Sequence, residues 1–264
     1  MTRLTLKSLA ARPLRTALTT LAIVLGVALV SGALTLTDTQ RKAADALSAA
    51  SYDGTDAVVA SKTAFATSSS EDWNLERPPV DAAVLRDVRA VPGVEVAVGD
   101  VTDQNAKIIG KDGKPLGEGP YFGVGLDAAA PGAERVTPFR LAEGRWASGP
   151  GEVVVDQKTS EDQGYALGDS VRIAGRGAAR SYEVTGVARF GDVKSLGPAT
   201  VAVFDLAVAQ ELFGKGDGYD SILVAARDDV AGADVRRALT QALGARAAVE
   251  VASEHDRFTF KGLE

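Results

Sequence analysis

Glycine–lysine pairs are the first residues in this 264-residue chain whose spacing could support chemistry. A Walker-type phosphate loop has the pattern Gly-x-x-x-x-Gly-Lys, in which backbone N–H groups and the lysine surround a nucleotide phosphate. Gly-Lys pairs occur at 110–111, 113–114 and 214–215, and each lacks the upstream glycine. The sequence therefore predicts that any ATP hydrolysis associated with this protein takes place on another chain.

A second glycine pattern, Gly-x-Gly-x-x-Ala at 123–128, has the spacing of a dinucleotide-binding turn. Such a site also requires a strand before the motif and a helix that begins inside it. Pro131 and Gly132 follow almost at once and favour a break in regular structure. We therefore predict a tight turn at 123–128 and no cofactor-binding residues.

Metal and acid–base chemistry have few candidate residues. His255 is the single histidine and cysteine is absent, whereas zinc sites need several His, Cys or carboxylate ligands. A Ser-His-Asp arrangement would depend on His255, and the chain has no Gly-x-Ser-x-Gly motif. Residues 217–220 lack the spacing of a calcium loop. Adjacent acids point apart on helices and strands alike, so we expect solvated charges at Glu71-Asp72, Glu161-Asp162 and Asp228-Asp229. The sequence predicts no catalytic or metal-binding residues.

Two tryptophans could mark a contact with another protein. Trp73 falls in a polar loop at 62–79, and Trp146 follows a Gly-Arg pair. Tryptophan is enriched at protein interfaces. Packing of these loops onto the core explains the two residues equally well.

Charge is divided unevenly along the chain. The formal net charge of −6 separates into +4 for residues 1–37 and −10 for the remaining residues. Phosphate backbones are bound by clustered Lys and Arg, so a domain at −10 is a poor nucleic-acid binder. The 45% content of hydrophobic residues is that of a folded protein and excludes full disorder.

Residues 16–37 carry no charge and are mostly apolar. As a helix this run would be about 33 Å long, enough for a hydrocarbon core of about 30 Å. We therefore predict a transmembrane helix at 16–37. A cleaved signal peptide, with a weak site at 33–35, and a buried core helix remain as alternatives.

Four cations precede this run, and they predict its orientation. By the positive-inside rule, they favour a cytoplasmic segment at 1–15 and an extracytoplasmic domain at 38–264. These topology residues are Arg3, Lys7, Arg12 and Arg15. Small residues near one face of the predicted helix would allow a second helix to approach closely. They are Ala22, Gly26 and Ala33, in a chain that is rich in alanine throughout.

The outer part contains two similar strand–helix–strand patterns, at 56–101 and 221–252. Two such units packed together give a ferredoxin-like lobe. The intervening sequence is rich in glycine, with short β-type runs. We therefore predict an α+β fold: a split α/β lobe at about 52–105 and 195–252, with a β-rich lobe inserted at about 106–194.

These features together resemble the permease subunits of FtsX-like and MacB-like ABC transporters. The residues Arg12-Pro13-Leu14-Arg15-Thr16, running into Leu25-Gly26-Val27, look like the start of the first membrane helix of that family. The segment 141–173, with its Gly-Arg turn and Gly-Asp pair, resembles the outer core domain, and 182–187 resembles the strand that follows. The resemblance covers the whole chain. Members of that family return to the membrane further on, so the chain looks like an N-terminal part, or a truncated copy, of such a permease.

The resemblance implies a transport or motion-relaying function without enzymatic activity. The partners that it implies are a separate cytoplasmic ATP-binding ABC subunit, a second permease copy or homologue, and membrane lipid, with no nucleic acid. An alternative is a single-pass membrane-anchored binding domain without a transport role. A third hypothesis, an exported enzyme, is disfavoured by the missing site residues.

Overall fold

The computed structural model describes residues 18, 21–31, 52–62, 77–117, 120–194, 196 and 199–251. The chain divides into two compact units, Met1–Leu47 and Ser48–Glu264. In the first unit, Leu18 and residues 21–31 are helical with exposed side chains. Among the described residues, no helix combines the length and the apolar character needed to cross a bilayer. Both ends of the predicted span at 16–37 lie outside them.

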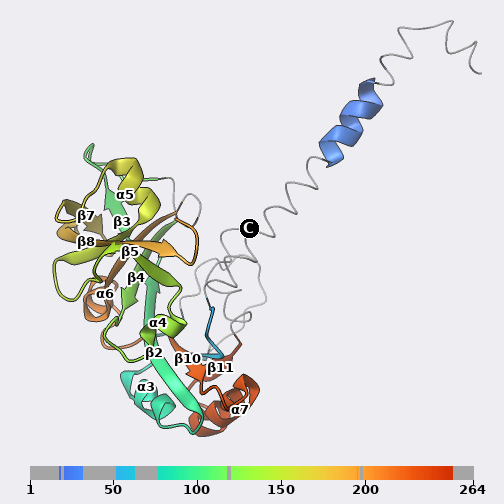
Figure 1. The fold of residues 1–264 in the computed structure, drawn as a ribbon, viewed down its shortest axis with the longest axis vertical. Helices are drawn as coiled ribbons and strands as arrows, with labels where there is room; N and C mark the ends of the chain where they lie inside the picture. Colours follow the sequence, from blue (N-terminus) through green and yellow to red (C-terminus); the bar gives the residue numbers. More distant parts are fainter. Residues whose placement is uncertain are drawn as a thin grey trace, which may run out of the picture. The chain divides into compact units, whose positions relative to one another are not determined.

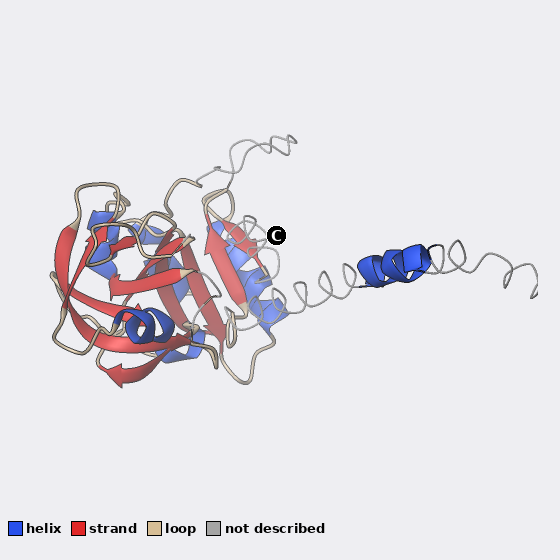
Figure 2. Ribbon diagram, turned by 90° about the horizontal axis from the view of Figure 1, so that it is seen from above, coloured by secondary structure: helices blue, strands red, loops and turns tan. Residues whose placement is uncertain are grey.

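The second unit is built on one mixed sheet of 11 strands, which confirms the α+β class (Figures 1 and 2). The order across the sheet is β11-β1-β10-β2-β4-β9-β6-β8-β7-β3, and β5 pairs with β8 beside this path. The strands are β1 (Ala57–Ala60), β2 (Val94–Asp103), β3 (Lys107–Ile109), β4 (Tyr121–Leu126), β5 (Phe139–Gly144), β6 (Glu152–Asp156), β7 (Ser170–Ala174), β8 (Arg180–Phe190), β9 (Thr200–Asp205), β10 (Ser221–Ala226) and β11 (Ala248–Glu250). The helices are α3 (Ala82–Arg89), α4 (Ala133–Val136), α5 (Gln157–Gln163), α6 (Leu206–Leu212) and α7 (Gly232–Leu243).

One end of the sheet combines two strand–helix–strand units, β1-α3-β2 and β10-α7-β11. Their four strands are all antiparallel, in the order β11-β1-β10-β2. Helices α3 and α7 lie side by side and bury their apolar stripes with one face of these strands in a common core. We call this region the α/β half and count residues 94–100 of β2 with it.

Local sequence explains the helix at the edge of this half. The Asp81 carboxylate accepts a hydrogen bond from the Ala83 N–H and caps α3. Val84, Leu85 and Val88 follow at helical spacing and are all buried. Gly93, with φ of 91°, then turns the chain into β2.

The opposite face of the α/β half is covered by a helix that comes from the chain segment between β4 and β5. The short helix α4, which lies between β4 and β5 in the chain, packs against β2 and β10. Its Ala133 and Val136 are buried with Val58, Val96 and Leu223. Arg135 adds an ion pair with Glu95 and a hydrogen bond of 3.0 Å to the carbonyl of Ala226.

The remainder of the sheet forms a second core, which we call the β-rich half: residues 101–103 of β2, the strands β3–β9, and helices α5 and α6. Its centre is strand β9, which lies between β4 and β6. Aromatic rings fill the core edge to face, with ring centroids 5.1 Å apart for Tyr182 and Phe204 and 6.2 Å apart for Phe204 and Phe213.

The position of β9 and α6 differs from the sequence-based division into lobes. The prediction grouped residues 195–212 with the α/β lobe, whereas both partners of β9 belong to the β-rich half. A buried run such as Val201–Phe204 has the same apolar pattern whichever strands flank it. We therefore count β9 and α6 with the β-rich half.

Strand β2 joins the two halves. Its residues from Val94 to Asp100 pair with β10 on one edge, and Val101–Asp103 pair with β4 on the other. Figure 1 shows β2 running from α3 up to β4. The pairing partner of β2 thus changes between Asp100 and Val101.

Candidate functional site

The residues predicted to set membrane topology lie outside the described part of the chain, as does Ala33. Ala22 and Gly26 lie on the described helix and are exposed. A methyl group added at Gly26 would meet no atom within 4 Å, so this position is open to a neighbouring helix. The packing role of these residues remains a prediction.

The large apolar side chains of the described helix are exposed. Ile23 is 61% exposed and Leu29 is 75% exposed, and the other large side chains between them are exposed in similar measure. Transfer of such side chains from water to an apolar environment is favourable, by about 25 cal/mol per Å² of apolar surface. The helix is therefore suited to an apolar environment.

The glycine motif at 123–128 is not a tight turn, and this prediction was wrong. Gly123 and Gly125 lie within strand β4. A Cβ atom on Gly125 would be 2.6 Å from the Ala209 methyl carbon. The glycines therefore allow α6 to lie directly on the sheet, which explains the motif without a nucleotide.

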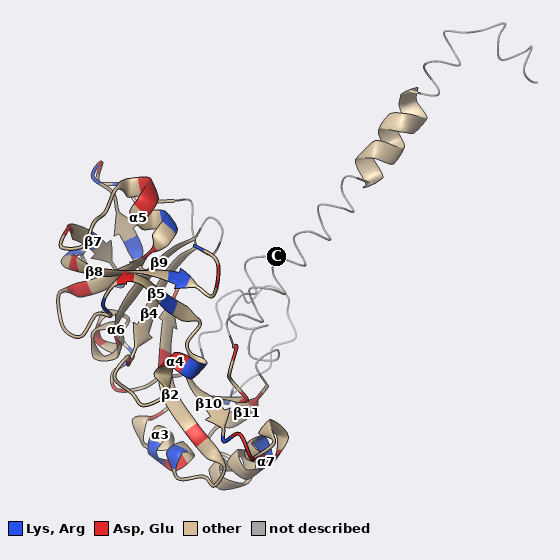
Figure 3. Ribbon diagram, viewed as in Figure 1, with Lys and Arg blue, Asp and Glu red and all other residues tan. Residues whose placement is uncertain are grey.

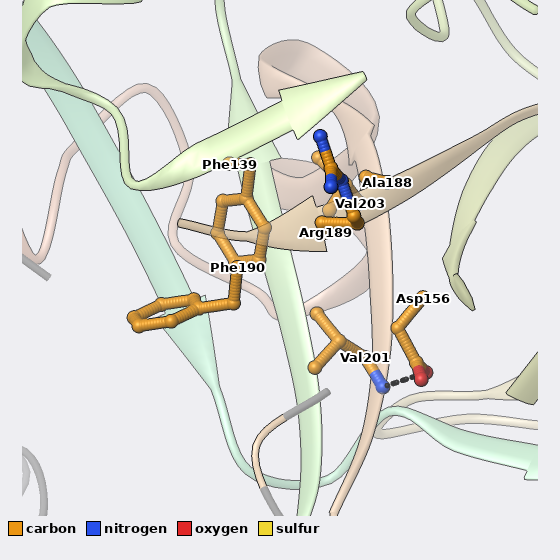
Figure 4. Close-up of a pocket in the computed structure, with 7 residues that line it drawn as sticks. All are labelled: Phe139, Asp156, Ala188, Arg189, Phe190, Val201 and Val203. Atoms are coloured by element: carbon orange, nitrogen blue, oxygen red, sulfur yellow. Dashed lines mark hydrogen bonds between the residues drawn. The ribbon is translucent and has the colours of Figure 1, made fainter. Parts of the chain in front are cut away.

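Figure 4 shows a small apolar pocket beside strand β9. Its lining residues are Phe139, Asp156, Ala188, Arg189, Phe190, Val201 and Val203. The buried Asp156 carboxylate accepts hydrogen bonds from the Thr159 N–H, the Thr159 hydroxyl and the Val201 N–H, at 2.6–3.0 Å. With three donors around it, this carboxylate is a structural cap of α5 and not a free general base.

Other acidic residues also serve structure in the part of the chain that the structure describes. Glu161 pairs with Lys194, and its neighbour Asp162 pairs with Lys158. Asp228 lies near Arg135. No group of three or more metal-ligating side chains occurs within the described residues. Glu71, Asp72, Trp73 and His255 lie outside them.

The Gly-Arg turn identified in the sequence closes the connection from β5 to β6. Arg145 forms a bidentate ion pair with Glu152, with N–O distances of 2.8 and 2.6 Å. The Ser148 N–H also donates to Glu152, at 3.0 Å. The Arg145 guanidinium and Ser148 together lower the pKa of the Glu152 carboxyl to about 2. Trp146, between them, is half-buried.

The junction between the two halves is the most specific arrangement in the described molecule. Tyr219 contacts both hydrophobic cores, and burial raises the pKa of its hydroxyl. Its ring lies on Gly99 of β2, where a Cβ atom would be only 2.3 Å from the ring carbons. Its backbone exchanges two hydrogen bonds with Val80, 2.6 and 2.9 Å long. In the sequence, residues 217–220 were considered only as a calcium loop, whose spacing they lack, and this role was missed. The available signal was the single glycine within the β2 run.

The described part of the second unit is thus one mixed sheet with two hydrophobic cores joined at strand β2. The profile of the MacB-like periplasmic core domain matches residues 16–242, and the chain belongs to that family. The resemblance to MacB-like permeases is thereby confirmed. Domains of this family are parts of transporter permeases and are generally non-catalytic.

Two solved structures are similar in fold. The periplasmic region of MacB from Actinobacillus actinomycetemcomitans superposes with a TM-score of 0.54 at 15% identity, over 79% of this chain and 94% of that one. The extracellular domain of the noncanonic ABC-type transporter YknZ from Gram-positive bacteria gives a TM-score of 0.50 at 14% identity, over 74% and 98%. No curated protein sequence matches the chain significantly.

Proposed function

We propose that the chain belongs to a permease subunit of an ABC transporter of the FtsX/MacB type. The observation that carries the proposal is the family match, which begins at residue 16, at the start of the uncharged run. In this proposal residues 16–37 cross the membrane as a helix. Residues 1–15 lie in the cytoplasm and residues 38–264 lie outside. The exposed apolar side chains at 21–31 support a lipid environment for this helix.

The proposed role is to export or extract cargo, or to relay ATP-driven motion across the membrane. Two relatives support it by their names: MacB, and YknZ, which is described as an ABC-type transporter. Because the three Gly-Lys pairs do not form phosphate loops, the ATPase would be a separate cytoplasmic subunit. A second permease copy or homologue would complete the complex, and Ala22, Gly26 and Ala33 are the proposed helix-packing residues.

The outer domain would act through its two halves. The strand order β11-β1-β10-β2 supports the proposed ferredoxin-like α/β lobe. The β-rich lobe would be inserted between the two segments of that α/β lobe, with its far boundary moved from about 194 to about 213. In this proposal the outer domain relays motion through its two halves, a role that requires no catalytic residue.

Co-purification from membranes tests the proposal. The full chain with an affinity tag is expressed together with the ABC ATP-binding subunit encoded nearest to it, and both are extracted in mild detergent. We expect the ATPase to co-purify and its ATP turnover to change when the chain is present. A second variant tests the proposed packing face: Gly26→Leu adds bulk to that face while keeping the helix apolar. Recovery of the chain from membranes without the ATPase would favour a single-pass anchored binding domain instead.

A further inference from the structure

Within the sheet, strand β2 alone joins the two halves, and outside the sheet α4 also packs against the α/β half. At 94–100 strand β2 is paired only with β10, and at 101–103 only with β4, among the described pairings. Where an interface between parts of a domain is small, relative motion is the default expectation. Bending of β2 between Asp100 and Thr102 would therefore let the two halves move separately unless something stiffens this point.

The loop that leads from α6 to β10 lies across this point of β2. The Asp220 N–H donates to the carbonyl of Asp100, at 2.9 Å. The Asp220 carboxylate accepts from the Thr102 N–H, at 2.9 Å. One acidic residue thus holds β2 on both sides of the position where its pairing changes.

Three further contacts hold the loop itself in place. Lys215, whose side chain is 8% exposed, forms an ion pair of 2.9 Å with Asp220. Gln210 of α6 donates to the carbonyl of Gly218, at 3.0 Å. Gly218 is also packed against Pro79, since a Cβ atom there would be 2.6 Å from the proline Cβ. The loop is therefore anchored to the β-rich half by α6 and to the α/β half by the segment before α3.

We propose that Tyr219, seated on Gly99, and Asp220 form a latch that makes the two halves one cooperative body, so that displacement of one half is transmitted to the other instead of being lost by bending of β2. The ring of Tyr219 contributes contacts to both cores, and a flat ring reaches the β2 backbone only because residue 99 has no side chain. The consequence for transport rests on the function proposed above. The coupling of the two halves is a property of the domain and is tested without it.

The test measures whether a substitution in one core changes the amide hydrogen-exchange rates in the other half. Exchange is followed by mass spectrometry on the full chain in detergent micelles. Ile173→Val removes one methylene from the β-rich core, where Ile173 is completely buried. Such a change typically accelerates exchange through cooperative opening by about fivefold. With the latch intact, we expect Ile173→Val to accelerate exchange at Val96–Val98 in the α/β half by the same factor as in β6 and β9. With Tyr219→Leu or Gly99→Ala added, we expect the factor to persist in the β-rich half and to fall to about one at Val96–Val98.

Matched variants separate the latch from general destabilisation. Tyr121→Leu exchanges another half-buried tyrosine, and Gly177→Ala adds a methyl group that meets no atom within 4 Å. Both should leave the coupling intact. If Tyr219→Leu does not fold, Gly99→Ala and Asp220→Asn probe the same contacts from the other side.

Two results would overturn the latch. One is an unchanged exchange rate at Val96–Val98 when Ile173→Val is made in the otherwise native chain. The other is coupling that survives all the latch variants and is lost in Arg135→Ala, which would assign it to α4. If the two halves are coupled through the latch but no ATPase co-purifies, the latch is supported and the transporter proposal fails. If the ATPase co-purifies but the latch variants do not change the coupling, the transporter proposal is supported and the latch fails.

Discussion

The ring of Phe213 lies directly on Gly123 of strand β4, where a Cβ atom would be 2.2 Å from the ring Cζ. Phe213 is completely buried and follows the end of α6. The missing side chain at Gly123 therefore determines how closely the end of α6 approaches the sheet. A glycine that resembles part of a cofactor motif in the sequence serves here to make room for an aromatic ring.

Gly123→Ala should destabilise the domain by overpacking, by about 1–3 kcal/mol or more, because both the ring and the strand are enclosed. Denaturant unfolding of the full chain in detergent, followed by tryptophan fluorescence, measures the loss. Gly149→Ala is the matched control, since its added methyl group meets no atom within 4 Å. Equal stability of the two variants would show that Phe213 relaxes without cost.

The two strand-ending aspartates should differ in importance. Asp156 is buried and accepts three hydrogen bonds, whereas Asp205 is half-buried and accepts a hydrogen bond from the Ala207 N–H. We expect Asp156→Ala to cost about 3 kcal/mol, because it leaves buried donors unpaired. Asp205→Ala should cost about 1 kcal/mol, as is usual for the loss of a helix N-cap. Thermal unfolding of both variants measures the difference, and a reversed order would contradict the assignment.

Acid should weaken the turn between β5 and β6. The pKa of Glu152 is lowered to about 2 by Arg145 and Ser148, so its ionised form favours the folded state. This stabilisation is fully present above the ordinary glutamate pKa of about 4.5 and is lost as pH falls from there towards about 2. Because the pair is partly exposed, solvent and salt reduce its size. Carboxyl NMR titration reads the pKa directly, and Arg145→Met should return it towards the ordinary value.

Membrane orientation can be read with reporter fusions. A fusion at residue 5 should be active in the cytoplasm and one at residue 150 outside, since four cations flank the uncharged run on its N-terminal side. Reversing the charge of Arg12 and Arg15 should reduce the fraction with this orientation. A mature protein that begins near residue 34 would instead identify a cleaved signal peptide.

Removal of residues 106–194 tests the division into halves. The sequence alone predicts that a short glycine–serine linker in their place leaves a folded α/β lobe. In the structure this deletion removes β4 and β6, the two strands that flank β9, and also α4. We therefore expect the shortened chain to aggregate or to lack a cooperative thermal transition. A sharp transition in that variant would show that β4, β6 and α4 are dispensable to the α/β half.

Local pattern by itself determined several features of this protein. The uncharged run at 16–37 and the charges before it are read directly from residue types. The stripes that became α3 and α7, and the valine runs that became β2 and β6, follow from side-chain periodicity, which depends on neighbours only a few residues away. The absence of a phosphate loop is likewise a matter of spacing.

Only the tertiary structure decided which strands pair. It also decided the junction between the two halves, where Tyr219 lies on Gly99. The apolar pattern of β9 would fit between any two buried strands. Its actual partners, β4 and β6, both lie more than forty residues earlier in the chain, so the pairing depends on long-range contacts. The same holds for Gly99 and Tyr219, which are separated by 120 positions in the sequence and in contact in the fold. A glycine has no side chain to show a preference, so its purpose becomes visible only when the ring that occupies its space is known.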